Sequence, residues 1–225
     1  PSSWVARQLK GELPKNWDAN VPEFSAEKAE ATRNASGTVL NALARSLGNM
    51  IGGSADLAPS NKSVLKDCGE YGTDCTCCGA NIHFGVRELA MGAIVNGLAL
   101  HGGLIPYGAT FLVFSDYVRP SMRLSALMQC HSIFIYTHDS IGVGEDGPTH
   151  QPVEHLWAAR LIPGFTVYRP GDANETAECW KLAISRGEPC LLALTRQNLA
   201  TLDLAKYPVK SGVQQGGYVL AGNGA

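Results

Sequence analysis

Apolar residues along this chain fall into runs of two lengths, separated by polar and glycine-rich segments. The longer runs have the composition of helices and predict them at residues 26–47, 88–100, 111–129, 152–160 and 173–185. The short runs predict strands at residues 50–54, 82–84, 104–106, 132–137, 165–168 and 190–195. Helices that alternate with strands indicate an α/β fold with a parallel sheet and helices on both faces.

The ends of the chain interrupt this alternation and set the predicted domain division. Residues 1–24 are polar and are predicted to be an N-terminal arm or linker, whereas residues 25–200 are predicted to form one domain. Residues 201–225 are rich in Gly and are predicted to be an exit linker toward a C-terminal domain that the chain lacks. Ser25 and Asp172 are the expected N-caps of the first and last helices.

Charge and composition exclude several classes of function. A formal net charge of −2 offers no basic surface for nucleic acid, and no apolar run reaches the roughly 18 residues of a membrane-spanning helix. Cys75, Cys77 and Cys78 cluster in a loop, but no second pair follows at metal-ligand spacing, so no metal site is predicted. The odd count of seven cysteines fits a reducing compartment better than a disulfide framework.

A loop rich in titratable side chains follows the predicted strand at 132–137. Residues 138–155 contain three His, two Asp and two Glu, and their Gly and Pro residues prevent a regular helix. The loop leaves the carboxyl end of a strand, which is the edge where open α/β sheets bind their ligands. We therefore predict a binding or catalytic site at this edge.

Five sequence blocks carry a resemblance to a known family. They are Gly52–Asn61 (GGSADLAPSN), Phe84–Glu88 (FGVRE), Ala109–Tyr117 (ATFLVFSDY), His138–Pro152 (HDSIGVGEDGPTHQP) and Thr195–Leu199 (TRQNL). In this order and spacing they resemble the pyrimidine-binding domain of transketolases, and the resemblance covers residues 14–220. It implies a thiamine-diphosphate-dependent transfer of a two-carbon ketol unit between sugar phosphates, as in the pentose phosphate pathway or the Calvin cycle.

Glu88 is the candidate catalytic residue. It begins a predicted helix after a turn at Gly85, and an acid that only complements the helix dipole is the simpler interpretation. The resemblance implies the glutamate that hydrogen-bonds the pyrimidine N1′ and promotes the imino tautomer, whose nitrogen then removes the thiazolium C2 proton. Leu89 stands where the family often has His or an aromatic residue.

Four further residues are candidates for binding the cofactor. Phe111, Phe114 and Tyr117 recur every three residues, which on the predicted helix would also suit a core stripe. The resemblance implies that these rings line the aminopyrimidine pocket, and flat rings suit a flat heterocycle. Asp56 follows a predicted strand, where a turn or N-cap is the simpler interpretation, and the resemblance implies a place beside the cofactor at a subunit interface.

The opening loop supplies candidates for binding the substrate. The resemblance implies that His138 binds the sugar phosphate near its phosphate end and that Asp146 binds a hydroxyl of the donor sugar. His150 either takes part or only braces the loop.

Two arginines and a serine are the candidate phosphate ligands. Arg196 directly follows an apolar strand, whereas Arg33 lies inside the first predicted helix, where a solvated side chain is the simpler interpretation. Arginine suits bidentate phosphate recognition, and the resemblance implies that Arg33, Ser60 and Arg196 form this clamp. Gly37 stands where the family commonly has Glu.

The motif that binds the diphosphate and its metal does not occur in this chain. In transketolases it is Gly-Asp-Gly followed by Asn, but the only Gly-Asp pair here is Gly171-Asp172, before Ala173. The resemblance therefore implies a Mg²⁺ whose ligands belong to a separate domain, and a homodimer whose site lies at the subunit interface. The chain alone is expected to hold about half a site and to be inactive.

Two other functions remain open at this point. Dihydroxyacetone synthase is a related ketol transferase that uses formaldehyde, and a non-catalytic transketolase-like subunit would share the fold. We expect the compartment to be the cytoplasm or the chloroplast.

Overall fold

Seven short strands form one parallel sheet at the centre of the molecule. The computed structural model describes residues 3–72 and 79–222. The strand order is β3-β4-β2-β5-β6-β8-β7, and every neighbouring pair is parallel. The strands are β2 Met50–Ser54, β3 Glu70–Tyr71, β4 Asn81–His83, β5 Ile105–Phe111, β6 Ile133–Thr137, β7 Thr166–Tyr168 and β8 Cys190–Leu194.

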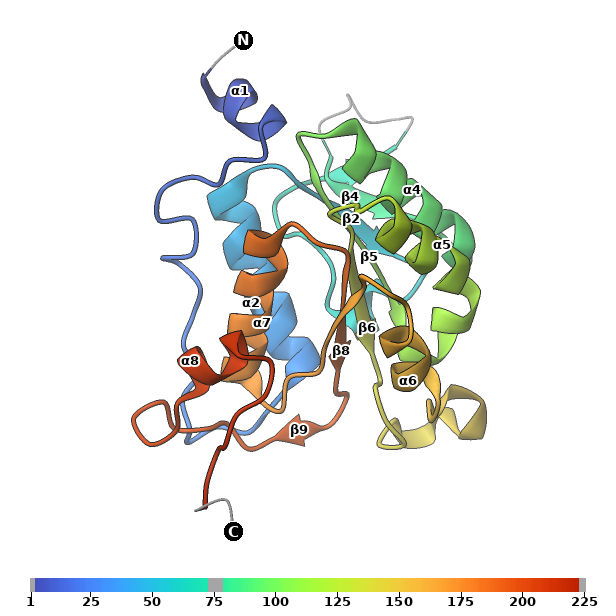
Figure 1. Ribbon diagram of the computed structural model, residues 1–225. Coiled ribbons are helices and arrows are strands. Elements are labelled where there is room, and N and C mark those ends of the chain that lie inside the picture. Colours follow the sequence, from blue (N-terminus) through green and yellow to red (C-terminus); the bar gives the residue numbers. More distant parts are fainter. Residues whose placement is uncertain (1–2, 73–78, 223–225) are drawn as a thin grey trace.

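Helices cover both faces of this sheet, as Figure 1 shows. The helices α2 Thr32–Leu47 and α7 Ala173–Arg186 lie on one face, with α8 Val209–Gln214 packed outside α7. The helices α4 Glu88–His101, α5 Ser115–Leu127 and α6 His155–Arg160 lie on the other face. The predicted α/β class, with a parallel sheet covered on both sides, is confirmed.

The remaining elements are short. They are the helices α1 Ser3–Leu9 and α3 Ala58–Asn61, the 3-10 turns η1 Leu112–Phe114, η2 Gly144–Asp146 and η3 Pro148–His150, and the antiparallel pair β1 Glu30–Ala31 and β9 Asn198–Leu199.

The central strands alternate between two apolar clusters. In β6, Ile133 and Ile135 pack with residues of α2 and α7, whereas Phe134 and Tyr136 pack with residues of α4 and α5. All residues of β6 and β8 are buried, which is what a parallel sheet covered on both faces requires. This continuous burial explains why these strands appear in the sequence as unbroken apolar runs.

The first helix begins later than its sequence predicts. Ser25 does not cap it: the Ser25 hydroxyl accepts a hydrogen bond from the Glu27 main-chain N–H in a local turn. Residues 30–31 are instead extended and pair with β9, so α2 starts only at Thr32. The predicted cap at Asp172 is confirmed, because its carboxylate accepts a hydrogen bond from the Glu175 main-chain N–H at 2.7 Å.

A second correction concerns the segment before α5. The predicted helix at 111–129 is wrong at its start, and the predicted strand at 104–106 is too short. The strand β5 continues to Phe111 because its residues pair with β2 on one side and β6 on the other. Every residue of β5 is buried, so apolar periodicity could not separate strand from helix there.

The segments outside the predicted domain also contact the core. Leu13, Trp17, Val21 and Phe24 of the N-terminal arm pack against the cluster formed by α2 and α7, and Val209 of α8 is fully buried. The division at residues 24/25 and 200/201 stays a prediction. Within the described residues, no helix has the length and apolar character needed to cross a membrane.

Cys75, Cys77 and Cys78 lie outside the described residues, so the prediction that they bind no metal stays a prediction. Residue 70 begins the short edge strand β3, for which no strand is predicted from the sequence, and α6 begins at His155 rather than at Pro152.

Candidate functional site

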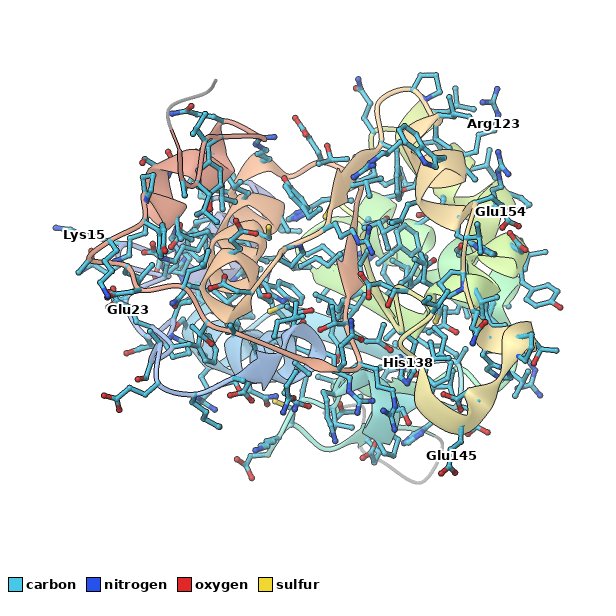
Figure 2. The ribbon with its side chains drawn as sticks, turned by 90° about the horizontal axis from the view of Figure 1, so that it is seen from below. Lys15, Glu23, Arg123, His138, Glu145 and Glu154 are labelled. Atoms are coloured by element: carbon cyan, nitrogen blue, oxygen red, sulfur yellow. The ribbon has the colours of Figure 1, made fainter. Side chains whose placement is uncertain are left out.

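The carboxyl ends of the parallel strands meet at one edge of the sheet, at the bottom of Figure 1. The carboxyl ends of β2, β4, β5, β6 and β8 and the segments that follow them contain all the predicted site residues except Arg33, which lies at the start of α2. Figure 2 views this edge from below, and in it His138 lies inward of Glu145 in the loop that follows β6.

A cavity of about 500 Å³ opens at this edge. Its walls combine apolar side chains, two carboxylates and one imidazole. They are Ala55, Asp56, Leu57, Val86, Glu88, Phe114, Tyr117 and His150. Four of these eight, namely Asp56, Glu88, Phe114 and Tyr117, are predicted site residues.

Glu88 is the first residue of α4 and lies on the cavity wall. A tight turn places it there: Gly85 has a φ of +66°, a conformation that favours glycine, and its carbonyl accepts a hydrogen bond from the Arg87 N–H at 2.8 Å. The Tyr136 hydroxyl is buried nearby without a hydrogen-bond partner among the described residues. Burial, with a contribution from the negative charge of Glu88, holds the pKa of Tyr136 well above its usual range.

The predicted aromatic residues form one row of rings, although they do not share a helix. Phe111 ends β5, Phe114 ends η1 and Tyr117 lies in the first turn of α5. The ring centroids of Phe111 and Phe114 are 6.0 Å apart, and those of Phe114 and Tyr117 are 6.2 Å apart. The prediction that the three rings lie on one helix is therefore wrong, but a strand end followed by a 3-10 turn keeps them adjacent.

The row continues into the opening loop. The His138 ring stacks on Phe111 with centroids 3.7 Å apart. His150 meets Phe114 edge-on at 5.4 Å and also lines the cavity. His150, which the sequence left undecided, is thus part of the cavity wall, and Phe111 connects the cavity to His138.

His138 occupies an unusual position at the end of β6. It is 3% exposed and has a φ of +59°, which is uncommon for a residue other than glycine. Burial, reinforced by the positive charges of Arg33 and Arg196, lowers the pKa of His138 to about 4. The imidazole is therefore neutral at physiological pH.

Two arginines lie beside His138. The Arg33 Nη1 donates a hydrogen bond to the Ser60 main-chain carbonyl at 3.0 Å, and burial together with the charge of Arg196 lowers the Arg33 pKa. The guanidinium of Arg196 lies so close to Gly144 that a Cβ on that glycine would meet it at 2.9 Å. The structure thus brings Arg33, Arg196 and His138 together.

Asp146 lies close enough to Arg33 and His138 for its charge to act on both. Its negative charge partly opposes the lowered pKa values of Arg33 and His138. Ser60 contacts Arg33 through its main chain rather than its hydroxyl. Two arginines beside a carboxylate and a neutral imidazole can bind a molecule that has both an anionic group and hydroxyl groups.

Asp56 connects the cavity to a smaller one of about 270 Å³. It has a φ of +62°, in the left-handed region that Asp tolerates better than most residues. The smaller cavity is also lined by Glu70 and His83, whose side chains pair at 2.7 Å.

One group of three potential metal ligands occurs among the described residues, outside the cavity. It comprises Asp116, Glu154 and His155, whose ligand atoms lie within 4.8 Å of one another. The His155 Nε2 is already paired with the Asp116 carboxylate at 3.2 Å. This pair connects the first turns of α5 and α6, next to Tyr117.

Several residues of the site were not predicted from the sequence. Ala55, Leu57 and Val86 line the cavity as ordinary apolar side chains, and although they lie within the recognised sequence blocks, their residue types do not distinguish them from core residues. Asn61 and Thr137 are fully buried at the same edge, and both belong to the recognised sequence blocks or stand next to one.

The fold is that of an α/β domain whose parallel sheet carries an aromatic cavity, an acid at a helix start and an arginine pair at its carboxyl edge. The family model "Transketolase, pyrimidine binding domain" matches residues 28–201. The chain belongs to this family, as the resemblance implied.

The chain is similar to named transketolases over nearly its whole length. It is 54% identical to the transketolase of Halalkalibacterium halodurans and 52% identical to that of Bacillus subtilis, in both cases over 95% of this chain and 32% of the relative. A crystal structure of Pichia stipitis transketolase in complex with sedoheptulose 7-phosphate superposes with a TM-score of 0.92 at 43% identity, over 98% of this chain and 33% of that one. The chain thus spans about a third of the length of these relatives.

Proposed function

We propose that this chain is the pyrimidine-binding part of a transketolase, which transfers a two-carbon ketol unit between sugar phosphates with thiamine diphosphate. The observation that carries the proposal is the position of Glu88 on an aromatic-walled cavity that adjoins the cluster of Arg33, Arg196 and His138. A cofactor site and an anion site thus lie side by side at one edge of the sheet.

The cavity suits an aminopyrimidine ring. Phe114 and Tyr117 offer flat apolar surfaces, and Glu88 offers a carboxyl group that can share a proton with a ring nitrogen. When bound, thiamine diphosphate supplies the nucleophilic carbon that attacks a ketose. Glu88 holds a proton at the pyrimidine, the aromatic rings exclude water, and Asp56 lies at the rim of the same cavity.

The neighbouring cluster suits the substrate. Arg33 and Arg196 bind a phosphate group, since guanidinium groups match its geometry, and Ser60 adds a third contact. Asp146 accepts a hydrogen bond from a sugar hydroxyl, and His138 binds near the phosphate end. The Pichia stipitis relative was solved with a sugar phosphate, which supports this assignment.

Other parts of the proposal concern the complete protein. Mg²⁺ and the diphosphate would be held by a separate domain, and the site would be completed at the interface of a homodimer. The compartment proposed is the cytoplasm or the chloroplast.

An activity assay of the complete protein tests the proposal. With xylulose 5-phosphate as donor and ribose 5-phosphate as acceptor, we expect ketol transfer that depends on added thiamine diphosphate and Mg²⁺. Transfer to formaldehyde alone would identify a dihydroxyacetone synthase instead. No transfer to either acceptor, with cofactor bound, would identify a non-catalytic subunit.

A further inference from the structure

A continuous line of buried hydrogen bonds runs from β2 to His138. The Ser54 hydroxyl and the Asn61 Oδ1 are 2.8 Å apart, the Asn61 Nδ2 and the Thr137 hydroxyl are 2.8 Å apart, and the Thr137 hydroxyl and the His138 Nδ1 are 2.8 Å apart. All four residues are at most 4% exposed, so water does not compete for these groups.

The orientation of the Asn61 amide follows from its other partner. The Asn61 Nδ2 lies 3.1 Å from the Thr110 main-chain carbonyl, and a carbonyl can only accept a hydrogen bond. The nitrogen of the amide must therefore face Thr110, and its second N–H points to Thr137. On the far side, the Asn61 Oδ1 accepts from Ser54, whose own oxygen accepts from the Leu57 main-chain N–H at 2.9 Å.

This orientation decides where the Thr137 hydroxyl proton points. Because the Thr137 oxygen already accepts from Asn61, its single proton needs an acceptor, and in the described part of the chain that acceptor is the His138 Nδ1. A buried hydroxyl proton without an acceptor would cost the protein a full desolvation penalty. The Nδ1 of a neutral imidazole that accepts carries no proton, so the proton lies on Nε2.

We propose that Ser54, Asn61 and Thr137 act as positioning residues that hold His138 as the neutral Nε2–H tautomer. The imidazole is then a hydrogen-bond donor, fixed in place by its stack on Phe111. It presents this donor, without a positive charge, to an oxygen of the sugar-phosphate substrate. The role toward substrate rests on the function proposed above, whereas the tautomer does not.

The charges around His138 agree with this assignment. Arg33 of α2, Arg196 after β8 and His150 of η3 all disfavour a positive imidazole, and only Asp146 of η2 favours one. With two arginines available to neutralise a phosphate, a neutral donor adds orientation without adding charge.

Replacing Asn61 by aspartate should reverse the direction of the hydrogen bond between Thr137 and His138. The carboxylate introduced by Asn61→Asp offers no N–H, so the Thr137 hydroxyl would donate to it and accept from the His138 Nδ1. Nuclear magnetic resonance of ¹⁵N-histidine-labelled protein reports the tautomer, with His138→Gln to assign the signal. We expect the Nε2–H tautomer in the wild type and the Nδ1–H or doubly protonated form in Asn61→Asp.

Two Thr137 variants keep the test decisive if Asn61→Asp does not fold. Thr137→Val removes the hydroxyl and should yield a mixture of tautomers, whereas Thr137→Ser keeps the hydroxyl and should restore the Nε2–H form. Thr201→Val is the matched control, since the Thr201 hydroxyl is also buried but donates to the Lys28 carbonyl rather than to a residue of the His138 network. That control should leave the His138 signals unchanged.

Kinetics of the complete enzyme provide the second readout. Asn61→Asp and Thr137→Val should lower kcat/KM for phosphorylated donors about tenfold or more, as loss of a substrate hydrogen bond does, and Thr137→Ser should recover most of the loss. A wild-type His138 with its proton on Nδ1, or variants that leave the tautomer unchanged, would overturn the inference. Because the tautomer is measured without substrate, a failed ketol-transfer assay alone would instead count against the proposed function.

Discussion

At the scale of single residues, His138 shows how strongly the fold changes the chemistry of a side chain. Burial and two arginines lower its pKa to about 4, whereas an unfolded chain leaves the histidine pKa near 6.5. Between these values the unfolded state binds a proton that the folded state does not. The contribution of His138 to stability is therefore fully present above about pH 6.5 and is lost as the pH falls toward 4.

This difference predicts a pH-dependent stability that His138 controls. Over the window from about pH 6.5 to 4, the loss attributable to His138 should approach roughly 3 kcal/mol. Urea unfolding of the wild type and of His138→Gln across this window measures it. The variant should lose less stability on acidification than the wild type, and equal losses would contradict the lowered pKa.

Arg196 carries a second prediction at this scale. Arg196→Ala should raise KM for phosphorylated sugars more than for unphosphorylated ones. The difference should correspond to a loss of about 1.5–3 kcal/mol of binding free energy, which is typical of a lost charge-assisted contact. Arg186→Ala is the matched control, because Arg186 ends α7 and lines a cavity to which none of Arg33, His138 and Arg196 contributes. If both classes of substrate lose affinity equally in Arg196→Ala, the phosphate role is wrong.

The sequence predicted the charged residues of the candidate site but not the residues that orient them. Glu88, His138 and Arg196 stand out because they follow turns or strands within recognisable blocks. Asn61 and Thr137 do not, because their importance depends on a contact between residues 76 positions apart. Such a contact exists only once β2, β5 and β6 are placed side by side.

At the scale of elements, apolar runs predicted β6 and β8 well, but they predicted β5 and several segment boundaries poorly. The strands β6 and β8 are bounded by polar or glycine-rich segments and were found close to their observed limits. The errors at Ser25 and Phe111 have one cause in common, because strand pairing with distant segments overrode the local signal. A local sequence pattern contains no information on these partners.

The cap of α7 is the element-scale feature that is simplest to test. The Asp172 carboxylate accepts from the Glu175 N–H at 2.7 Å and from the Leu202 N–H at 2.6 Å, so it joins α7 to the segment after β9. Asp172→Ala should destabilise the protein by roughly 2 kcal/mol, since it removes an N-cap and leaves a second donor unpaired. Thermal or urea unfolding measures the loss.

Asp203→Ala serves as the control for this prediction. The Asp203 carboxylate also accepts a local main-chain hydrogen bond, from Ala205, but in an exposed turn. The Asp203→Ala substitution should lower the free energy of unfolding by well under half as much as Asp172→Ala does. Equal losses would mean that the buried cap contributes nothing beyond a surface turn.

At the scale of the whole molecule, a row of adjacent rings links the cavity to the cluster of Arg33, Arg196 and His138. The row from Tyr117 through Phe114 and Phe111 to His138 joins them, and all of it lies at the carboxyl edge of the sheet. The sequence predicted this edge because its titratable loop follows a strand. It could not predict that the N-terminal arm and α8 pack on the core, since both segments appear polar or glycine-rich.

The chain holds the groups proposed to act on the pyrimidine and on the sugar, and its relatives are about three times as long. The site as proposed therefore depends on other parts of the complete protein for the diphosphate and Mg²⁺. Of the residues of this chain, only Glu88 is assigned a role in the chemical step.

The most direct test of this account is a comparison of turnover and cofactor affinity for Glu88→Gln in the complete enzyme. Glutamine keeps the shape of the side chain but cannot take or give the proton. We expect ketol transfer to fall by roughly 10² or more, while the affinity for thiamine diphosphate changes by less than about tenfold. Near-wild-type turnover in the variant would contradict the assignment of Glu88 and, with it, the proposed site.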